Sequence, residues 1–346
     1  MNEYKPKISL RKAIVLAVIA IVLMAVAGWL LSRENFYQMF ATIKNANHAY
    51  VALAITLYFL SIGIWASRWQ SALSFIGCKI AFGVRYRILC ASLFLNNITP
   101  GARIGGDPFG RVYITHRLEN MSYSSCMASL VGERALTPLV VVSFFMAGLL
   151  LRFGNGALQL TVVLIVVWVL VALGMVFFPR QFFRKKIALR RINGIMTRVL
   201  GWFGKPGAGE EIIEGVESFY SSSYATVDRW KKVLVIGAWT LLIGALDVFR
   251  IYTVFLALGY QPQISMLLLA SAVQPIVGVI PFLPGGLLLV EGSLLSVFAL
   301  FGVPLNIAMA ATVIERGISF VLSTIAGAAV FSFLGIKMAT KPEVQG

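Results

Sequence analysis

The stretch from Asn97 to Pro108 reads NITPGARIGGDP and interrupts an otherwise apolar segment at 88–118. A second break, IPFLPGG at 280–286, interrupts the apolar segment 264–302. Proline removes a backbone donor and glycine loosens a helix, so neither segment is expected to cross a membrane as one unbroken helix. Irregular backbone at membrane depth survives only where protein or water satisfies its polar groups. We therefore expect each segment to form a re-entrant hairpin of two half-helices.

The two broken segments belong to two copies of one module that lie 182 residues apart. Laid over itself at this offset without gaps, the sequence aligns Arg68 with Arg250 and Gly77 with Gly259. Two longer matches are Met127-Ala128 with Met309-Ala310, and Glu133-Arg134 with Glu315-Arg316. Apolar sequences align easily by chance, which is the alternative explanation, but ionisable pairs in one register favour a true repeat. Repeats with interrupted hydrophobic segments at corresponding places point to the binding site of a transporter.

Composition places the chain among polytopic membrane proteins. Of its 346 residues, 59% are hydrophobic and 13% are charged, and the mean hydropathy is +0.84. Soluble domains average about 45–50% apolar and about 25% charged residues. Little sequence lies outside hydrophobic stretches apart from a loop at 179–232, so we expect a single integral-membrane domain over 1–346. Within it we place repeat 1 at about 49–150 and repeat 2 at about 233–335.

The apolar runs predict an all-α protein with about six full transmembrane helices, which together with the two hairpins make about eight hydrophobic segments. About 20 apolar residues are needed to cross the hydrocarbon. The predicted spans are 13–31, 49–66, 124–150, 157–178, 233–258 and 304–335. The first run resembles a signal peptide because basic residues precede it. Its nineteen apolar residues exceed the usual signal core of about 7–15, so we expect it to remain as a helix.

Basic residues orient the chain, because cytoplasmic loops accumulate Lys and Arg. Loop 179–232 holds eleven basic residues against five acidic ones and is expected in the cytoplasm. Loop 32–48 carries little charge and is expected outside. The connection that follows is expected inside because of its basic residues Arg68, Lys79, Arg85 and Arg87. Both termini are then cytoplasmic, in a multi-pass protein of the cytoplasmic (inner) membrane. Helices 49–66 and 233–258 run in opposite directions, so the repeat is inverted and one hairpin enters from each face.

Loop 179–232 also contains a predicted amphipathic helix. Apolar residues recur at helical spacing from Ala188 to Phe203, while Arg184, Arg191 and Arg198 lie elsewhere on the helical wheel. A basic helix of this kind suits the anionic headgroups of a membrane surface. The alternative is retention of positive charge in the cytoplasm without lipid specificity. The net charge of +16 therefore indicates membrane topology, and no nucleic-acid partner is expected.

The pairs Glu133-Arg134 and Glu315-Arg316 are the first candidate site residues. Ionisable side chains inside a membrane cost at least about 2.5–3.5 kcal/mol each, so they normally pair or face water. Adjacent residues on a helix point about 100° apart, so Glu133 is not expected to neutralise Arg134. Approximate twofold symmetry predicts cross-pairing instead, of Glu133 with Arg316 and of Glu315 with Arg134. The alternative role of these pairs is a purely structural lock between the repeats.

A polar stripe accompanies each glutamate on its predicted helix. The stripe residues are Ser122, Ser125, Ser129, Gly132 and Thr137 in the first copy, and Thr312, Ser319, Ser323 and Gly327 in the second. Small and hydroxyl residues at this spacing often mark close helix packing. A carboxylate on the same stripe slightly favours a hydrated path.

The broken hairpins supply the second set of candidates. Asp107-Pro108 is typical of an N-cap followed by proline at the first helical position, so a half-helix is expected to begin there. Gly285-Gly286 is expected to begin the matching half-helix, which contains Glu291. Helix N-termini bind anions, and Arg103 can add a bidentate contact to a phosphate headgroup. Capping alone would also explain Asp107, and close helix packing would also explain the glycines.

The remaining polar residues predict structure rather than chemistry. Asp247 and Arg250 lie three residues apart on one predicted helix and are expected to pair structurally. The sequence contains no phosphate-binding loop with its Lys-Ser/Thr ending, and His48 and His116 lie far apart without partners. No nucleophile, base and orienting group can be assembled into a triad. We therefore expect no cofactor, no metal site and no enzyme.

At these motifs the sequence resembles the flippase-like membrane domain of lysylphosphatidylglycerol synthases and its stand-alone relatives. The resemblance spans about 15–335 and depends on the order and spacing of short motifs. The matching residues are Asn97, Thr99, Pro100, Gly101, Gly105, Gly106, Glu133, Arg134, Pro284, Gly285, Gly286, Glu291, Gly292, Glu315 and Arg316. The resemblance implies movement of a lipid, in the synthases an aminoacylated phospholipid, between leaflets. The synthases continue into a soluble aminoacyl-transferase domain, whereas this chain stops at Gly346, so we do not expect it to make such a lipid itself.

Together these features predict a lipid flippase or translocator that moves a membrane phospholipid or a lipid-linked precursor between leaflets. The predicted path consists of the matching residues other than Gly101 and Gly292, together with Arg103 and Asp107. A homo-oligomer is compatible with the sequence. An integral-membrane transferase that acts on lipid headgroups is a competing hypothesis, in which paired carboxylates do acid–base work. A secondary transporter of small solutes or ions and a partner-dependent scaffold are two more hypotheses that the sequence leaves open.

Overall fold

The computed structural model describes residues 33–98, 106–154, 162, 166, 229–278 and 286–339, and every regular element in these ranges is helical. The predicted span 13–31, most of the span 157–178 and the predicted loop helix lie outside the described residues. The same is true of the candidates Thr99, Pro100, Arg103, Gly105, Pro284 and Gly285.

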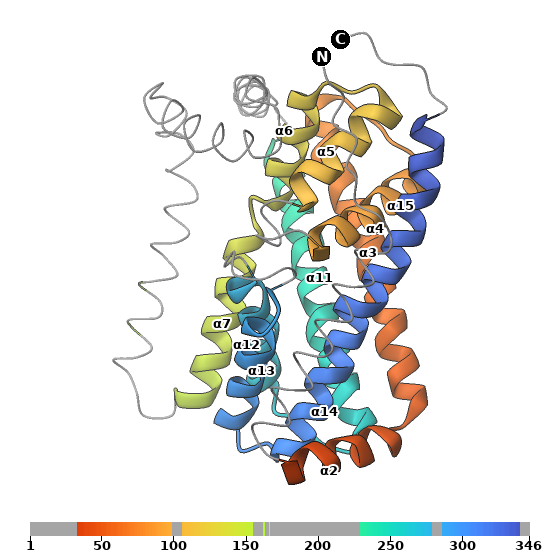
Figure 1. Ribbon diagram of the computed structural model, residues 1–346. Helices are drawn as coiled ribbons and strands as arrows, with labels where there is room; N and C mark the ends of the chain where they lie inside the picture. Colours follow the sequence, from red (N-terminus) through yellow and green to blue (C-terminus); the bar gives the residue numbers. More distant parts are fainter. Residues whose placement is uncertain are drawn as a thin grey trace.

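The described chain forms long helices joined by shorter ones (Figure 1). In order, the elements are α2 (Arg33–Lys44), α3 (His48–Leu73), η1 (Ser74–Ile76), α4 (Phe82–Ile98), α5 (Gly106–Glu119), α6 (Tyr123–Arg134), α7 (Thr137–Phe153), α11 (Arg229–Ala257), α12 (Ile264–Val277), α13 (Leu289–Leu300), α14 (Leu305–Arg316), the π-helical turn η3 (Gly317–Leu322) and α15 (Ser323–Ala339). Four stretches are long and apolar enough to cross a membrane: His48–Ile76, Ser125–Phe153, Lys231–Ala257 and Leu305–Ile336. They coincide with four of the six predicted spans.

Helices α3 and α11 pack against each other and run antiparallel (Figure 1). At one end, the Asn47 N–H that precedes α3 donates to the Ala257 carbonyl at the end of α11, at 2.8 Å. At the other end, Lys232 Nζ near the start of α11 donates to the Ser74 carbonyl that follows α3, at 3.2 Å. Asn47 also caps α3, because its side chain accepts from the Ala49 N–H at 3.0 Å. The two helices are therefore tied together at both ends.

Both broken segments are interrupted where the sequence predicts. Helix α4 ends at Ile98, α5 begins at Gly106, and the two helices pack on each other. Their contact is close: a Cβ at Gly110 would lie 2.2 Å from Leu95 Cδ1. Helices α12 and α13 form the matching pair. Figure 1 shows the α4–α5 pair in the upper half of the bundle and the α12–α13 pair in the lower half.

Each helix pair packs against a long helix from the other half of the chain. Helix α7 lies on α12, where a Cβ at Gly148 would come within 2.6 Å of Leu269 Cγ. Helix α15 lies on α4, where a Cβ at Gly327 would come within 2.4 Å of the Cys90 carbonyl oxygen. Glycine lets helix backbones approach closely in membrane bundles. The packing is thus exchanged between the halves.

Element boundaries recur at the offset of the sequence repeat. Helix α6 begins at Tyr123 and α14 at Leu305, and 123 + 182 = 305. The same two helices end at Arg134 and Arg316, and 134 + 182 = 316. Gly77 and Gly259, which follow α3 and α11, hold φ angles of 71° and 70°. Glycine adopts this left-handed conformation at little cost, so both turns depend on it.

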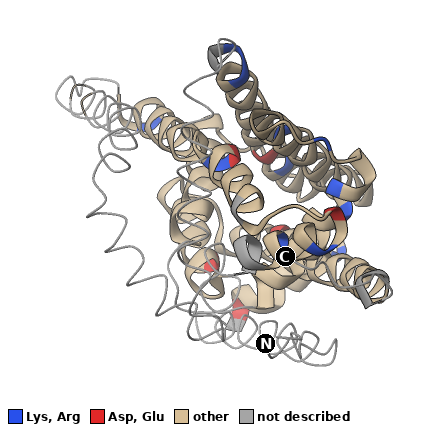
Figure 2. Ribbon diagram, turned by 90° about the horizontal axis from the view of Figure 1, so that it is seen from above, with Lys and Arg blue, Asp and Glu red and all other residues tan. Residues whose placement is uncertain are grey.

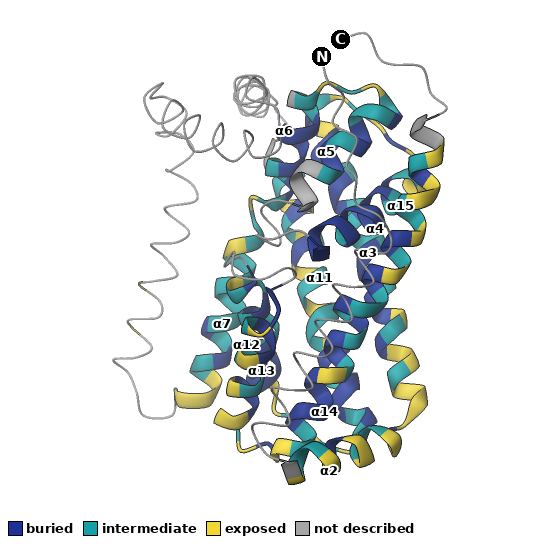
Figure 3. Cartoon of the chain, viewed as in Figure 1, coloured by how far each residue is buried: buried dark blue, intermediate teal, exposed yellow. Residues whose placement is uncertain are grey.

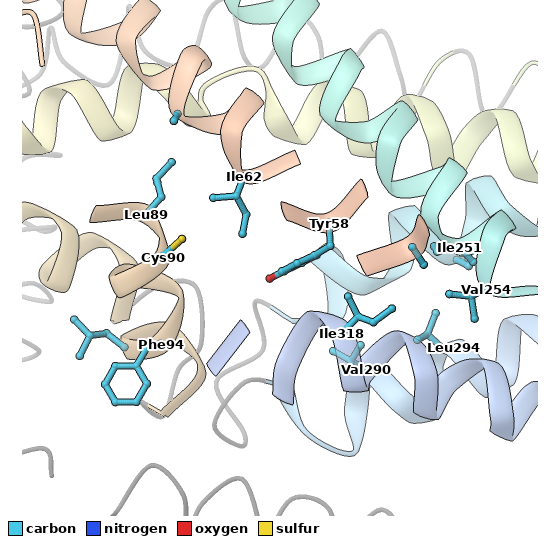
Figure 4. Packing of buried hydrophobic residues seen from close by; sticks show 14 of the residues in the cluster. Tyr58, Ile62, Leu89, Cys90, Phe94, Ile251, Val254, Val290, Leu294 and Ile318 are labelled. Carbon is cyan, nitrogen blue, oxygen red and sulfur yellow. The ribbon is translucent and has the colours of Figure 1, made fainter. Parts of the chain in front are cut away.

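The apolar core lies between the helices, and large apolar side chains also cover the outside. Figure 3 shows buried positions on the inward faces and exposed ones on the periphery. Leu234 and Ile325 are examples of exposed large apolar side chains. Contiguous exposed apolar surface marks a membrane or protein contact. Inside, Tyr58 and Ile62 of α3 lie among apolar residues of several helices (Figure 4). The remaining residues labelled there are Leu89, Cys90 and Phe94 of α4, Ile251 and Val254 of α11, Val290 and Leu294 of α13, and Ile318 of η3.

Candidate functional site

Glu133 is the centre of a buried ion cluster where α3, α5 and α6 meet. Its side chain has no solvent exposure, and Arg68 of α3 donates to Oε1 from Nη2 at 2.7 Å and from Nε at 3.2 Å. Trp65 Nε1, from the same helix, also donates to Oε1. Arg111 of α5 donates from Nη2 to Oε2. Both carboxylate oxygens of Glu133 are therefore engaged.

Arg68 belongs to this cluster and lies within α3, so the prediction that it is part of the connection after the helix is wrong. Helix α3 continues beyond the apolar run to Leu73, because Arg68 finds partners inside the bundle. Its Nη1 lies 3.5 Å from Thr137 Oγ1 and 3.4 Å from Thr240 Oγ1. Arg85 is also buried, and its Nε donates to the Ala66 carbonyl at 2.9 Å.

Glu315 is the centre of the second cluster, where α11 and α14 meet. Arg250 Nη1 lies 2.8 Å from Glu315 Oε1, and both side chains are buried. Arg250 Nη2 also donates to Asp247 Oδ1 at 3.3 Å, which confirms the predicted pair of Asp247 and Arg250. One guanidinium thus serves two carboxylates. Next to Glu315 in the chain, Arg316 donates from Nε to Glu291 of α13.

The predicted cross-pairing of Glu133 with Arg316 and of Glu315 with Arg134 is wrong. Glu133 binds Arg68 and Arg111, and Arg316 binds Glu291. The reason is that α3 and α11 lie beside α6 and α14 and supply an arginine to each glutamate from the same half of the chain. The Arg134 guanidinium lies instead 5.8 Å from the centre of the Trp65 ring.

The two clusters occupy equivalent positions at the repeat offset, and the arginine of each cluster contacts a residue from the other half of the chain. Arg68 of α3 reaches Thr240 of α11. In return, the Arg250 guanidinium of α11 lies 5.3 Å from the centre of the Tyr58 ring of α3. Arg68 corresponds to Arg250 and Tyr58 to Thr240, because 68 + 182 = 250 and 58 + 182 = 240. Such reciprocal contacts are what a twofold axis produces between two copies of one surface.

The clusters differ in the charge that the short helices add. Helix α5 brings a cation, Arg111, to Glu133, whereas α13 brings an anion, Glu291, to Arg316. The first cluster has three arginines and one glutamate (Arg68, Arg111, Arg134 and Glu133), and the second has two arginines and three carboxylates (Arg250, Arg316, Asp247, Glu291 and Glu315). Figure 2 shows acidic and basic stretches of ribbon close together in the view along the bundle. Among these residues, the first cluster is positive and the second is negative.

The other predicted site residues that the structure describes are not partners of Glu133 or Glu315, or do not have the role predicted for them. Asn97 Nδ2 donates to Ser323 Oγ at 3.0 Å and to Thr324 Oγ1 at 2.9 Å, which ties α4 to α15. Helix α5 begins at Gly106, one residue before the predicted cap Asp107, whose side chain lies outside the described part. The predicted half-helix start at Gly286 is wrong: its φ of 70° is not helical, and α13 begins at Leu289.

The polar stripe of the first copy makes bonds between helices. Trp69 Nε1 of α3 donates to Ser129 Oγ of α6 at 3.1 Å, and Thr137 lies beside Arg68. In the second copy, Ser323 accepts from Asn97. These contacts account for the stripe as helix packing, and the hydrated path stays a prediction.

Sequence reasoning missed Arg111 and the two tryptophans around it. The Arg111 guanidinium lies 3.8 Å from the centre of the Trp69 ring and 5.7 Å from that of Trp65. The signal was present: Arg111 is an ionisable residue in the apolar segment 88–118, and Trp65 and Trp69 stand one helical turn apart next to Arg68. A survey of every ionisable residue in the interrupted segments would have found it.

The chain matches known proteins over nearly its whole length. The family model described as the lysylphosphatidylglycerol synthase TM region matches residues 14–327. A UPF0104 membrane protein of Methanothermobacter thermautotrophicus is 28% identical over 342 residues, which is 95% of each chain. A UPF0104 membrane protein of Pyrococcus horikoshii is 26% identical over 336 residues, which is 91% of this chain and 95% of the relative. Because the family model covers most of its residues, this membrane protein belongs to the family of lysylphosphatidylglycerol synthase transmembrane regions.

Proposed function

We propose that this protein moves a phospholipid or a lipid-linked precursor between the leaflets of the cytoplasmic membrane. The observation that carries the proposal is the pair of equivalent clusters around Glu133 and Glu315, each buried beside an interrupted helix pair. Ionisable residues within membrane segments are rare and mark the paths of substrates and ions. The family is named after the membrane region of a lipid synthase, which supports a lipid as the substrate.

The arrangement of the halves supports an inverted repeat as the basis of transport. Helices α3 and α11 are antiparallel, the two short-helix pairs lie toward opposite ends, and the packing is exchanged between the halves. Transporters built from inverted repeats bind their substrates at the interface between the repeats. In our proposal the α4–α5 pair enters from the cytoplasmic face and the α12–α13 pair from the opposite face.

The clusters give a polar headgroup partners at a depth where lipid offers none. A polar group moved into hydrocarbon without a hydrogen bond costs about 2–7 kcal/mol. Arginine and glutamate side chains at the repeat interface lower this cost by taking up the headgroup while the acyl chains stay in the membrane. No chemical change of the lipid is involved.

The test is transport by the purified full chain in liposomes. Liposomes carry a fluorescent phospholipid or a lipid-linked phosphate in both leaflets, and an impermeant reductant bleaches the outer leaflet. The protein is expected to raise the bleached fraction above one half, and Glu133→Gln or Glu315→Gln to slow this at equal amounts of folded protein. Glu34→Gln, on the exposed face of α2, is the matched control. Lack of movement for every lipid class would refute transport, and a changed lipid mass would indicate a transferase instead.

A further inference from the structure

We propose that Arg111 anchors an anion site that accepts a phosphate group, either from a lipid headgroup or from free phosphate. In its lipid form this inference deepens the proposed function and rests on it. The site lies on α5 of the first cluster, between Trp65, Trp69 and Glu133.

The first argument is the hydrogen-bond inventory of Arg111. Its side chain is 1% exposed, and within the part of the chain that the structure describes only Nη2 has a hydrogen-bond partner, Glu133. Nε and Nη1 are buried, and among the described residues neither has a hydrogen-bond partner. A guanidinium has five N–H donors, and a buried charged donor without an acceptor is costly, so native proteins rarely leave one. An acceptor from outside the chain would satisfy both nitrogens.

The second argument is that the carboxylate of this cluster is already shared among several donors. Both oxygens of Glu133 are taken by Arg68, Trp65 and Arg111. Arg68 shows what a satisfied arginine looks like here, because all three of its nitrogens lie within hydrogen-bond distance of partners. Two buried guanidinium groups, those of Arg68 and Arg111, share this one carboxylate, which favours an anion as the further acceptor.

The third argument is that Arg111 is held ready. Trp69 covers the guanidinium at 3.8 Å, a cation–π contact that orients its plane without using its N–H groups. Arginine is the usual partner of phosphate oxygens, and phosphate is the anion that every phospholipid brings into the membrane.

The experiment measures binding, so it does not depend on transport. The full chain in detergent is titrated in a calorimeter with dihexanoyl phosphatidylglycerol, with sodium phosphate, and with dihexanoylglycerol, which lacks phosphate. The wild type is expected to bind the phosphatidylglycerol and not the dihexanoylglycerol. Arg111→Gln and Arg111→Lys are expected to weaken binding about tenfold or more, the loss of a charge-assisted hydrogen bond. Arg152→Gln, an exposed arginine at the end of α7, is the matched control.

The outcomes separate the two sources of phosphate and the two proposals. If sodium phosphate competes with the lipid, the site accepts free phosphate. If it does not compete, the site is specific for a headgroup. Both outcomes support Arg111 as the anchor of an anion site. If Arg111→Gln does not fold, Arg111→Lys keeps the charge and decides the question. A second readout is tryptophan fluorescence, which is expected to change when the wild type binds the ligand. The variant Trp69→Phe is expected to lose most of this change. Unchanged binding in the Arg111 variants, or no phosphate binding by the wild type, overturns the inference. If the protein does not bind phosphate at Arg111 but still moves lipid between leaflets, the proposed function is retained and only this inference is overturned.

Discussion

Each central glutamate is neutralised by an arginine that stands 65 residues before it in the chain. Arg68 serves Glu133, and Arg250 serves Glu315, with 315 − 250 = 65. Removing one partner of a buried pair leaves an uncompensated charge, which costs about 3–5 kcal/mol. Stability and transport are therefore linked at these residues, and variants must be compared at equal amounts of folded protein.

The ion pairs predict a specific pattern of energetic coupling. In a double-mutant cycle, Arg250→Gln and Glu315→Gln are expected to interact by about 0.5–3 kcal/mol, because the residues are in contact. Glu133→Gln and Arg316→Gln are expected to add within about 0.5 kcal/mol, because they belong to different clusters. The free energy of unfolding in detergent, from denaturant titration, measures both. Coupling in the second cycle and none in the first would instead support cross-pairing between the halves.

The sequence identified the central residues but not their partners. Glu133 and Glu315 stood out because a carboxylate inside an apolar run needs a partner, and the repeat placed Arg68 and Arg250 in register. The choice of partner depends on which helices pack together, and a symmetry argument limited to two dipeptides could not supply that. Arg111 could not be assigned in the same way, because its position in the sequence has no charged counterpart at the repeat offset: 111 + 182 = 293 is Ser293.

At the scale of helices, glycine sets how closely the two halves approach. Gly327 of α15 faces the backbone of α4, where an added Cβ would lie 2.4 Å from the Cys90 carbonyl oxygen. Gly327→Ala is expected to destabilise the protein by about 1–3 kcal/mol, because backbone cannot yield as a flexible side chain does. Gly335→Ala, on the same helix with nothing within 4 Å, is the control. Thermal unfolding in detergent compares the two, and equal midpoints would show that α15 and α4 do not pack this closely.

The positions of the helices were predicted best from the sequence, and the residues at which they begin and end were predicted worst. Apolar runs placed four spans, and the Pro and Gly residues placed both interruptions. The end of α3 at Leu73 was missed, because polar residues after 66 looked like a loop until their partners inside the bundle were known. The start of α13 was missed because Gly286 and Leu288 take positive φ angles that only the surrounding packing imposes.

For the whole molecule, the topology predicted from the basic residues places the two ends of α3 on opposite sides of the membrane. Asn45 and Lys79 flank α3 at opposite ends, and both are exposed. In a background without Cys78, Cys90 and Cys126, Asn45→Cys is expected to react with an impermeant maleimide in intact cells. Lys79→Cys is expected to react only after permeabilisation. Reaction of both from the same side would mean that α3 does not cross the membrane.

The packing of helices from one half against helices from the other half also affects how the protein folds during translation. Helices α4 and α7 are synthesised early, yet their partners α15 and α12 come from the second half. From the end of α7 to the start of α12 the chain advances by 264 − 153 = 111 residues, and from the end of α4 to the start of α15 by 323 − 98 = 225 residues. At about 5–20 residues per second, these intervals take about 5–45 s to translate. During that time, the faces of α4 and α7 that later pack against α15 and α12 are not yet covered by them. Slowing elongation in the second half would prolong this exposed state and leave more half-made chains open to quality-control proteases.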